Sequence, residues 1–90
     1  MPKTLNKFAC YEWGRIRNVI YAASYDPEDD DYLSEDMQST LGKMVEGPCT
    51  QENVDKLKAF CLTREAQVYV LVVWHILPMI DDLTCAANYK

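Results

Sequence analysis

Histidine occurs once in the 90 residues, at His75, and glycine occurs only three times. Nucleophilic catalysis needs an activating base beside the nucleophile, and phosphate-binding loops need several closely spaced glycines. A thiol-imidazole pair of His75 with Cys61 or Cys85 has neither a second base nor an oxyanion element near it. We therefore expect a non-enzymatic protein with no catalytic residue and no cofactor, in which His75 is a packed or partly exposed core residue.

Recognisable metal-binding spacings are also missing. The four cysteines are Cys10, Cys49, Cys61 and Cys85. Their separations of 39, 12 and 24 positions lack the short paired spacing of structural zinc sites. A calcium loop of the EF-hand type starting at Asp26 would need glycine and glutamate where this chain has Asp31 and Met37. The sequence therefore predicts no metal site.

A secretory signal is absent from the start of the sequence, where Met1-Pro2-Lys3-Thr4 leads into alternating polar and apolar residues. We therefore expect a cytoplasmic protein with reduced thiols. Cys10, Cys61 and Cys85 lie in apolar stretches and should pack as small hydrophobic residues. Two disulfides, for which four cysteines allow three pairings, are the alternative.

Long apolar runs and an excess of basic residues are absent as well. The longest apolar run, residues 68–80, is interrupted by His75 and Pro78 and is shorter than a membrane-spanning helix. Nine Lys and Arg residues stand against 14 Asp and Glu residues, a net charge of −5. Because phosphate backbones and anionic membranes attract cationic proteins, we expect no direct binding to nucleic acid or to a membrane.

Acidic residues, by contrast, are concentrated in one short window. Half of them fall within residues 26–36, at Asp26, Glu28, Asp29, Asp30, Asp31, Glu35 and Asp36. Acids in the first turn of a helix complement its dipole, which explains about three of the seven. The remaining acids are expected to meet basic residues of a protein partner, or to mimic a phosphate track. A solvated helix face is the alternative.

Hydrophobic spacing predicts one helical domain, residues 1–90, in an all-α bundle of four or five short helices. The first helix spans residues 4–24, with Thr4 or Asn6 as its N-cap. Gly14, in the middle of this helix, predicts the close approach of another helix.

The second helix is expected to begin near Pro27, because proline is favoured at the first helical position. Asp29, Tyr32 and Asp36 would then share one face of this helix. Its apolar stripe comprises Leu33, Met37, Leu41, Met44 and Val45. Thr50 is expected to cap a third helix.

A helix near residues 65–77, apolar on all sides, is expected to be buried at the centre of the bundle. Residues 68–74 are rich in strand formers, so a strand within an α+β fold is the alternative. No second candidate strand exists to pair with them, which favours the helix. Pro78 should kink or end this helix.

Aromatic residues gather in the first third of the chain, beside Arg15 and Arg17, at Tyr11, Trp13, Tyr21, Tyr25 and Tyr32. Tyrosine, tryptophan and arginine are the residue types that most often anchor protein interfaces. We expect Trp13, Arg17, Tyr25 and Tyr32 to join the acidic residues in one partner-binding surface. Completion of the core is the alternative.

A small acidic chain of this kind is similar in type to the inhibitors that phages and mobile elements encode against host nucleases or DNA-binding machinery (anti-CRISPR-like). It also resembles in type the immunity proteins that neutralise toxins. The resemblance implies an acidic helix that occupies a basic, nucleic-acid-binding surface of a protein partner, in the host cytoplasm if a phage encodes the chain. A structural subunit that forms a homodimer through the aromatic patch is the alternative.

Overall fold

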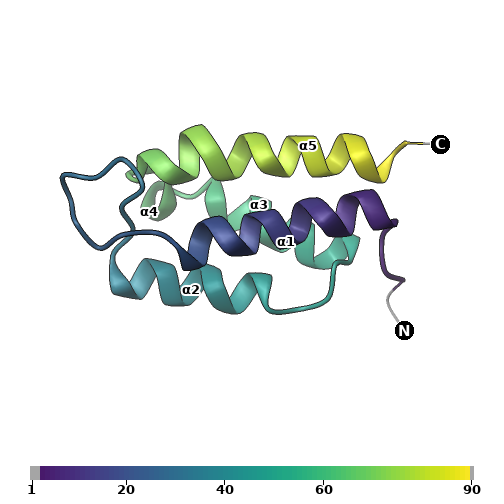
Figure 1. Ribbon diagram of the computed structural model, residues 1–90, viewed down its shortest axis with the longest axis horizontal. Helices are drawn as coiled ribbons and strands as arrows, with labels where there is room; N and C mark the ends of the chain where they lie inside the picture. The colour runs from purple at the N-terminus through teal and green to yellow at the C-terminus, as the bar shows by residue number, and fades with distance from the viewer. Residues whose placement is uncertain (1–2, 90) are drawn as a thin grey trace.

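The computed structural model describes residues 3–89 and contains helices joined by turns and loops (Figure 1). The elements are α1 (Lys7–Tyr21), α2 (Glu35–Val45), α3 (Gln51–Cys61), α4 (Arg64–Gln67), the π-helical turn η1 (Val72–Ile76) and α5 (Leu77–Ala87). Within the described residues there are two isolated β-bridges but no strand. The all-α bundle is therefore confirmed, and residues 68–74 contribute no strand to it.

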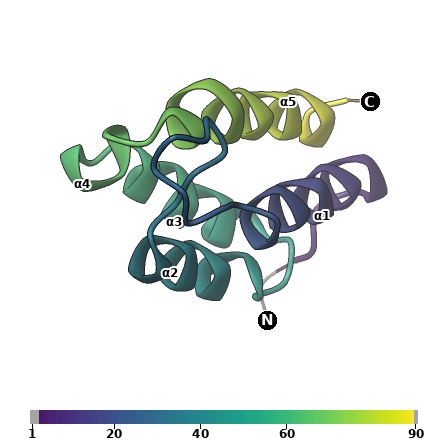
Figure 2. The same cartoon turned by 60° about the vertical axis from the view of Figure 1, so that its left-hand side comes forward.

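The helices form an elongated bundle measuring 41 × 22 × 22 Å (Figures 1 and 2). α1 packs lengthwise on α5 and, on its other side, on α2, while α3 contacts α2 and α5. The connection between α1 and α2 projects from one end of the bundle, and the start of α1 and the end of α5 lie toward the other (Figure 1). None of the helices in residues 3–89 combines the length and the apolar character needed to cross a membrane.

The first helix begins later than predicted, at Lys7, and Asn6 rather than Thr4 is its N-cap. The Asn6 side chain accepts a hydrogen bond from the Ala9 amide at 2.9 Å. The buried stripe of α1 consists of Ala9, Trp13, Ile16 and Ile20. Trp13 therefore belongs to the core, whereas Phe8 is exposed.

The two mid-helix glycines differ in their surroundings. A Cβ at Gly14 would have no neighbour within 4 Å, so the predicted close approach of another helix at this position is wrong. A Cβ at Gly42, in α2, would lie 3.3 Å from Cε1 of Tyr21. The close approach between α1 and α2 thus occurs at Gly42, where the tyrosine ring occupies the space of the missing side chain.

The second helix begins at Glu35 with Ser34 as its N-cap, not near Pro27. The intervening Asp side chains accept bonds from nearby amides instead. Asp26 Oδ1 accepts from the Glu28 amide at 3.0 Å, and Asp29 Oδ1 accepts from the Asp31 amide at 2.9 Å. Such local bonds compete with helical hydrogen bonds and favour turns.

The predicted packing of the second and third helices is largely confirmed. Four residues of the predicted stripe are buried and Met44 is half-buried. Thr50 caps α3 by accepting a hydrogen bond from the Asn53 amide at 3.2 Å.

Residues 65–77 do not form a buried central helix. The chain turns at residues 68–69, and a second helical stretch runs from Val70 through η1 and α5. Only one stripe of the segment is buried, namely Ala66, Leu71, Val72 and Ile76, whereas Val68 is 75% and Trp74 71% exposed. The segment is thus amphipathic, and its many strand-forming residues do not make it central.

The helix continues through Pro78 by widening its preceding turn. The Leu77 amide donates to the carbonyl of Val72, five residues back, as in a π-helix. Proline in a regular helix lacks one amide donor and clashes with the carbonyl four residues back. The π-turn that precedes Pro78 is the irregularity expected at such a position.

Replacing Gly14 with Ala should raise the free energy of unfolding by up to about 1 kcal/mol, since alanine favours the helix and its Cβ meets open space. Urea denaturation followed by circular dichroism measures this change. Gly42→Ala is the matched control: its helix-propensity gain is the same, but its Cβ presses on the Tyr21 ring, so a smaller gain or a loss is expected. A destabilised Gly14→Ala variant would contradict the open surroundings of this position.

Candidate functional site

Five exposed carboxylates lie on the projecting connection between α1 and α2, which we call the acidic loop (residues 26–31; Figures 1 and 2). They belong to Asp26, Glu28, Asp29, Asp30 and Asp31. The loop is closed by backbone hydrogen bonds from the Ser24 amide to the Asp31 carbonyl at 3.1 Å and from the Leu33 amide to the Ser24 carbonyl at 2.8 Å. Its carboxylates therefore sit on an ordered loop and not on a helical face as predicted.

The acidic loop has no ion pair within residues 3–89. The ion pairs there are Arg15–Glu12 at 3.1 Å and Lys56–Glu52 at 3.2 Å, and both join neighbouring turns of one helix. Glu35 and Asp36, in the first turn of α2, are likewise exposed and unpaired within those residues. These two carboxylates, rather than those of the acidic loop, complement the dipole of α2.

Two residues predicted for the partner surface have structural roles instead. Trp13 is 2% exposed, and its indole N–H donates to the Gly47 carbonyl at 3.0 Å. Arg17 donates from Nε and Nη2 to the Val45 carbonyl, at 3.0 and 2.9 Å. Both side chains thus satisfy backbone carbonyls at the end of α2, which are bonds that helical spacing alone does not reveal.

Of the two remaining aromatic candidates, only Tyr25 is exposed. Tyr32 packs on Tyr69 with 5.2 Å between ring centroids, and the Tyr69 hydroxyl donates to Ser34 Oγ at 2.9 Å. Partial burial, together with the neighbouring Tyr69 hydroxyl, raises the pKa of Tyr32. Tyr32 therefore supports the base of the acidic loop from within.

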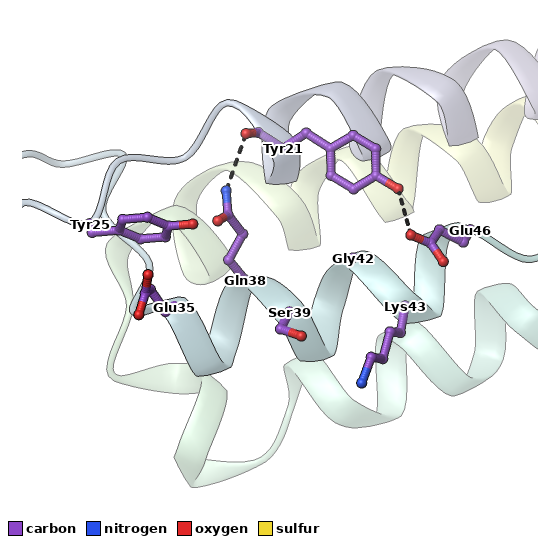
Figure 3. Close-up of a pocket in the computed structure, with 8 residues that line it drawn as sticks. All are labelled: Tyr21, Tyr25, Glu35, Gln38, Ser39, Gly42, Lys43 and Glu46. Carbon is purple, nitrogen blue, oxygen red and sulfur yellow. Dashed lines mark hydrogen bonds between the residues drawn. The ribbon is translucent and has the colours of Figure 1, made fainter.

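A groove that sequence reasoning missed lies beside the acidic loop, between the end of α1 and α2 (Figure 3). This α1–α2 groove has a volume of about 390 Å³ and is lined by Tyr21, Tyr25, Glu35, Gln38, Ser39, Gly42, Lys43 and Glu46. Its floor is Gly42, and the Tyr21 ring lies against that glycine. In the sequence, only the glycine within the helix, Gly42, marks this groove. No local pattern indicates that Tyr21 lies beside Gly42.

Hydrogen bonds hold the walls of the α1–α2 groove in place. The Tyr21 hydroxyl donates to Glu46 Oε1 at 3.2 Å (Figure 3). Partial burial, and then the carboxylate of Glu46, raise the pKa of Tyr21. The Gln38 amide donates to the carbonyls of Ile20, Tyr21 and Ala23 at 2.9, 3.1 and 3.2 Å, which closes the C-terminal end of α1.

His75 is an exposed residue and not a core one. Together with the acidic loop it lines a concave surface that includes neither Cys61 nor Cys85. Within residues 3–89, no three His, Cys, Asp or Glu side chains are grouped so that they could hold a metal ion.

All four cysteines are free thiols. Cys49 and Cys61 are buried and Cys10 is half-buried, but Cys85 is exposed, which corrects its expected place in the core. Burial raises the pKa of the Cys49 and Cys61 thiols to about 12. The buried thiols are therefore poor nucleophiles at neutral pH.

The chain matches no protein-family model, no curated protein and no solved structure. A function must therefore be inferred from the chemistry of its own surface. The two features that stand out are the unpaired acidic loop and the α1–α2 groove beside it.

Alkylation of the folded protein at about pH 8 should modify Cys85 first and Cys61 last, because only a thiolate reacts and burial opposes its formation. Mass spectrometry of peptides after timed exposure to iodoacetamide measures the order. In urea all four thiols should react at similar rates. Equal rates for Cys61 and Cys85 in the folded protein would contradict the placement of Cys61 in the core.

Proposed function

We propose that this protein is a non-enzymatic inhibitor that binds a protein partner through the acidic loop and the first turn of α2. Its target is a basic, nucleic-acid-binding surface of that partner. The observation that carries the proposal is a loop that projects from one end of the bundle and bears exposed carboxylates, none of them with an ion pair in residues 3–89.

Concentrating like charges on one loop has an electrostatic cost that dispersing them would avoid. A solvated surface explains why these residues are exposed, but it does not explain why half of the chain's acids share 11 positions. A partner's lysine and arginine side chains would offset the repulsion and would be steered toward the loop.

Inhibition follows if the same cations normally hold a phosphate backbone. Nucleic-acid binding depends on Lys and Arg contacts to phosphates, so carboxylates that occupy these side chains compete with the nucleic acid. A phage anti-defence inhibitor or an immunity protein would act in this way. The partner would be met in the cytoplasm, that of the host if a phage encodes the chain.

Neutralising three loop charges should weaken partner binding while preserving the loop. Glu28→Gln, Asp30→Asn and Asp31→Asn, combined in one loop variant, leave the turn-forming side chains of Asp26 and Asp29 intact. We expect wild-type protein, immobilised and exposed to host lysate, to capture a basic protein that elutes between about 0.05 and 0.5 M salt. The loop variant should capture at least about tenfold less of it.

The matched control removes the same number of charges elsewhere, through Glu65→Gln, Asp81→Asn and Asp82→Asn, which are exposed and distant in sequence from the loop. It should capture as much as the wild type. The captured protein, once purified, should lose nucleic-acid binding when the wild-type chain is added. Equal capture by the loop variant and the control, or binding that does not depend on salt, would refute the proposal.

Self-association is a second candidate function, although the predicted aromatic patch in the first third of the chain is not continuous. Phe8 and Tyr89, both exposed, instead meet edge to face at 6.0 Å and, with Cys85, line an apolar hollow. Exposed apolar clusters of this kind favour protein interfaces.

This second candidate predicts a homodimer that dissociates when Phe8 is replaced with Ser. Light scattering coupled to size-exclusion chromatography, over a range of concentrations, measures the mass. A monomer mass at every concentration would dismiss the homodimer. A dimer that persists unchanged in Phe8→Ser would dismiss this surface as its interface.

A further inference from the structure

We propose that the α1–α2 groove binds an arginine side chain of the partner. This inference rests on the proposed function, because the arginine belongs to the same basic surface that meets the acidic loop. It adds a defined site and a side-chain preference to what is otherwise a diffuse attraction between opposite charges.

The groove has two aromatic walls over a floor without a side chain. The tyrosine residues of these walls are about half exposed, Tyr21 at 49% and Tyr25 at 52%. In Figure 3 their rings stand at either end of the groove, over the face of α2 that carries Gln38, Ser39 and Gly42. Aromatic faces attract guanidinium groups more than they attract most other polar groups.

Carboxylates accompany both rings. Glu35 lies beside Tyr25, and Glu46 accepts the hydrogen bond of the Tyr21 hydroxyl (Figure 3). Neither carboxylate has an ion pair within residues 3–89. A planar guanidinium can stack on a ring while its N–H groups donate to a carboxylate, whereas an ammonium group offers no plane for stacking.

Among residues 3–89, Lys43 is the one cation that lines the groove, and it opposes the binding of another. Its side chain forms no ion pair within the described residues, and in Figure 3 it points away from the Tyr21 ring. The groove therefore keeps room for a cation, but Lys43 should lower the affinity for it. Removing the charge of Lys43 should therefore raise the affinity of the groove for a cation, which can be tested.

The groove is continuous with the acidic loop. Tyr25 directly precedes Asp26, and Glu35 opens the helix that follows the loop. A partner segment that contacts the loop is therefore already beside the groove. Other concave surfaces of residues 3–89 fit an arginine less well. The hollow at His75 and that between Lys3 and Glu52 are lined by no aromatic residue, and that at Phe8 and Tyr89 is lined by no carboxylate.

The Tyr21 wall is also held before any ligand arrives. The hydrogen bond from its hydroxyl to Glu46 restricts the Tyr21 ring, which packs so near Gly42 that a Cβ there would lie 3.3 Å from Cε1. The bonds from Gln38 restrict the backbone that carries it. A site that is ordered in advance loses less entropy on binding.

The test uses two short synthetic peptides, Gly-Ser-Arg-Arg-Ser-Gly and the same peptide with lysine in place of arginine. Each is titrated into isotope-labelled protein and followed by NMR. We expect the arginine peptide to bind several-fold more tightly than the lysine peptide. Its arginine side-chain protons should shift upfield in the ring currents, and the amide shifts should include Tyr21, Tyr25, Glu35 and Gly42.

Substitutions of residues that line the groove test whether the arginine peptide binds there. Tyr25→Leu and Glu35→Gln should each weaken the arginine peptide about two- to fivefold, in line with one cation–π or ion-pair contact. Lys43→Gln should strengthen it. Tyr11→Leu, a tyrosine on α1 that is exposed but outside the groove, is the matched control and should change nothing.

The loop variant separates this inference from the proposed function. It should weaken both peptides equally, because it reduces the general field and leaves the groove intact. Equal affinities for both peptides, with Tyr25→Leu silent, would overturn the groove inference and leave the proposed function standing. Tight arginine binding that loses nothing in the loop variant would uphold the groove and count against the acidic loop as the source of attraction.

Discussion

The reciprocal capping of α1 and α2 is the interaction on which the rest of the surface depends. Side chains of α1 satisfy the carbonyls at the end of α2, through Trp13 to Gly47 and Arg17 to Val45. In return, Gln38 of α2 satisfies three carbonyls at the end of α1. The last carbonyls of a helix have no hydrogen-bond donor within that helix. Here each of the two helices supplies side-chain donors to the last carbonyls of the other. The exchange sets the register at which these two helices pass one another.

That register decides where the groove and the acidic loop lie. It places the Tyr21 ring over Gly42 and so forms the α1–α2 groove. It also anchors both ends of the connecting loop, since the Ala23 carbonyl is held by Gln38 and the Leu33 amide bonds to Ser24. The acidic loop can therefore keep a defined shape without any internal cation. The carboxylates of Asp26 and Asp29 help to shape the loop by accepting amide hydrogen bonds, whereas Glu28, Asp30 and Asp31 add charge to it.

Local sequence patterns predict those features of the fold that depend on residues close together along the chain. The Leu33 to Val45 stripe and the Thr50 cap follow from spacing and residue type, and both are present. The start of α2 was misplaced because Asp side chains formed turns where proline suggested a helix. Trp13 was misplaced because its burial depends on a carbonyl 34 residues away. The groove could not be predicted from the sequence for the same reason, because it forms where Tyr21 of α1 meets Gly42 of α2.

The projection of the acidic loop from one end of a 41 Å molecule has a consequence for what a partner senses. At physiological ionic strength the Debye length is about 8 Å, so charges farther away are screened. A basic surface that approaches the loop therefore experiences five carboxylates and little of the opposite end. The net charge of −5 understates this local field, because it averages over basic residues elsewhere in the chain. A basic surface that came within the last several ångströms would therefore be oriented toward the loop.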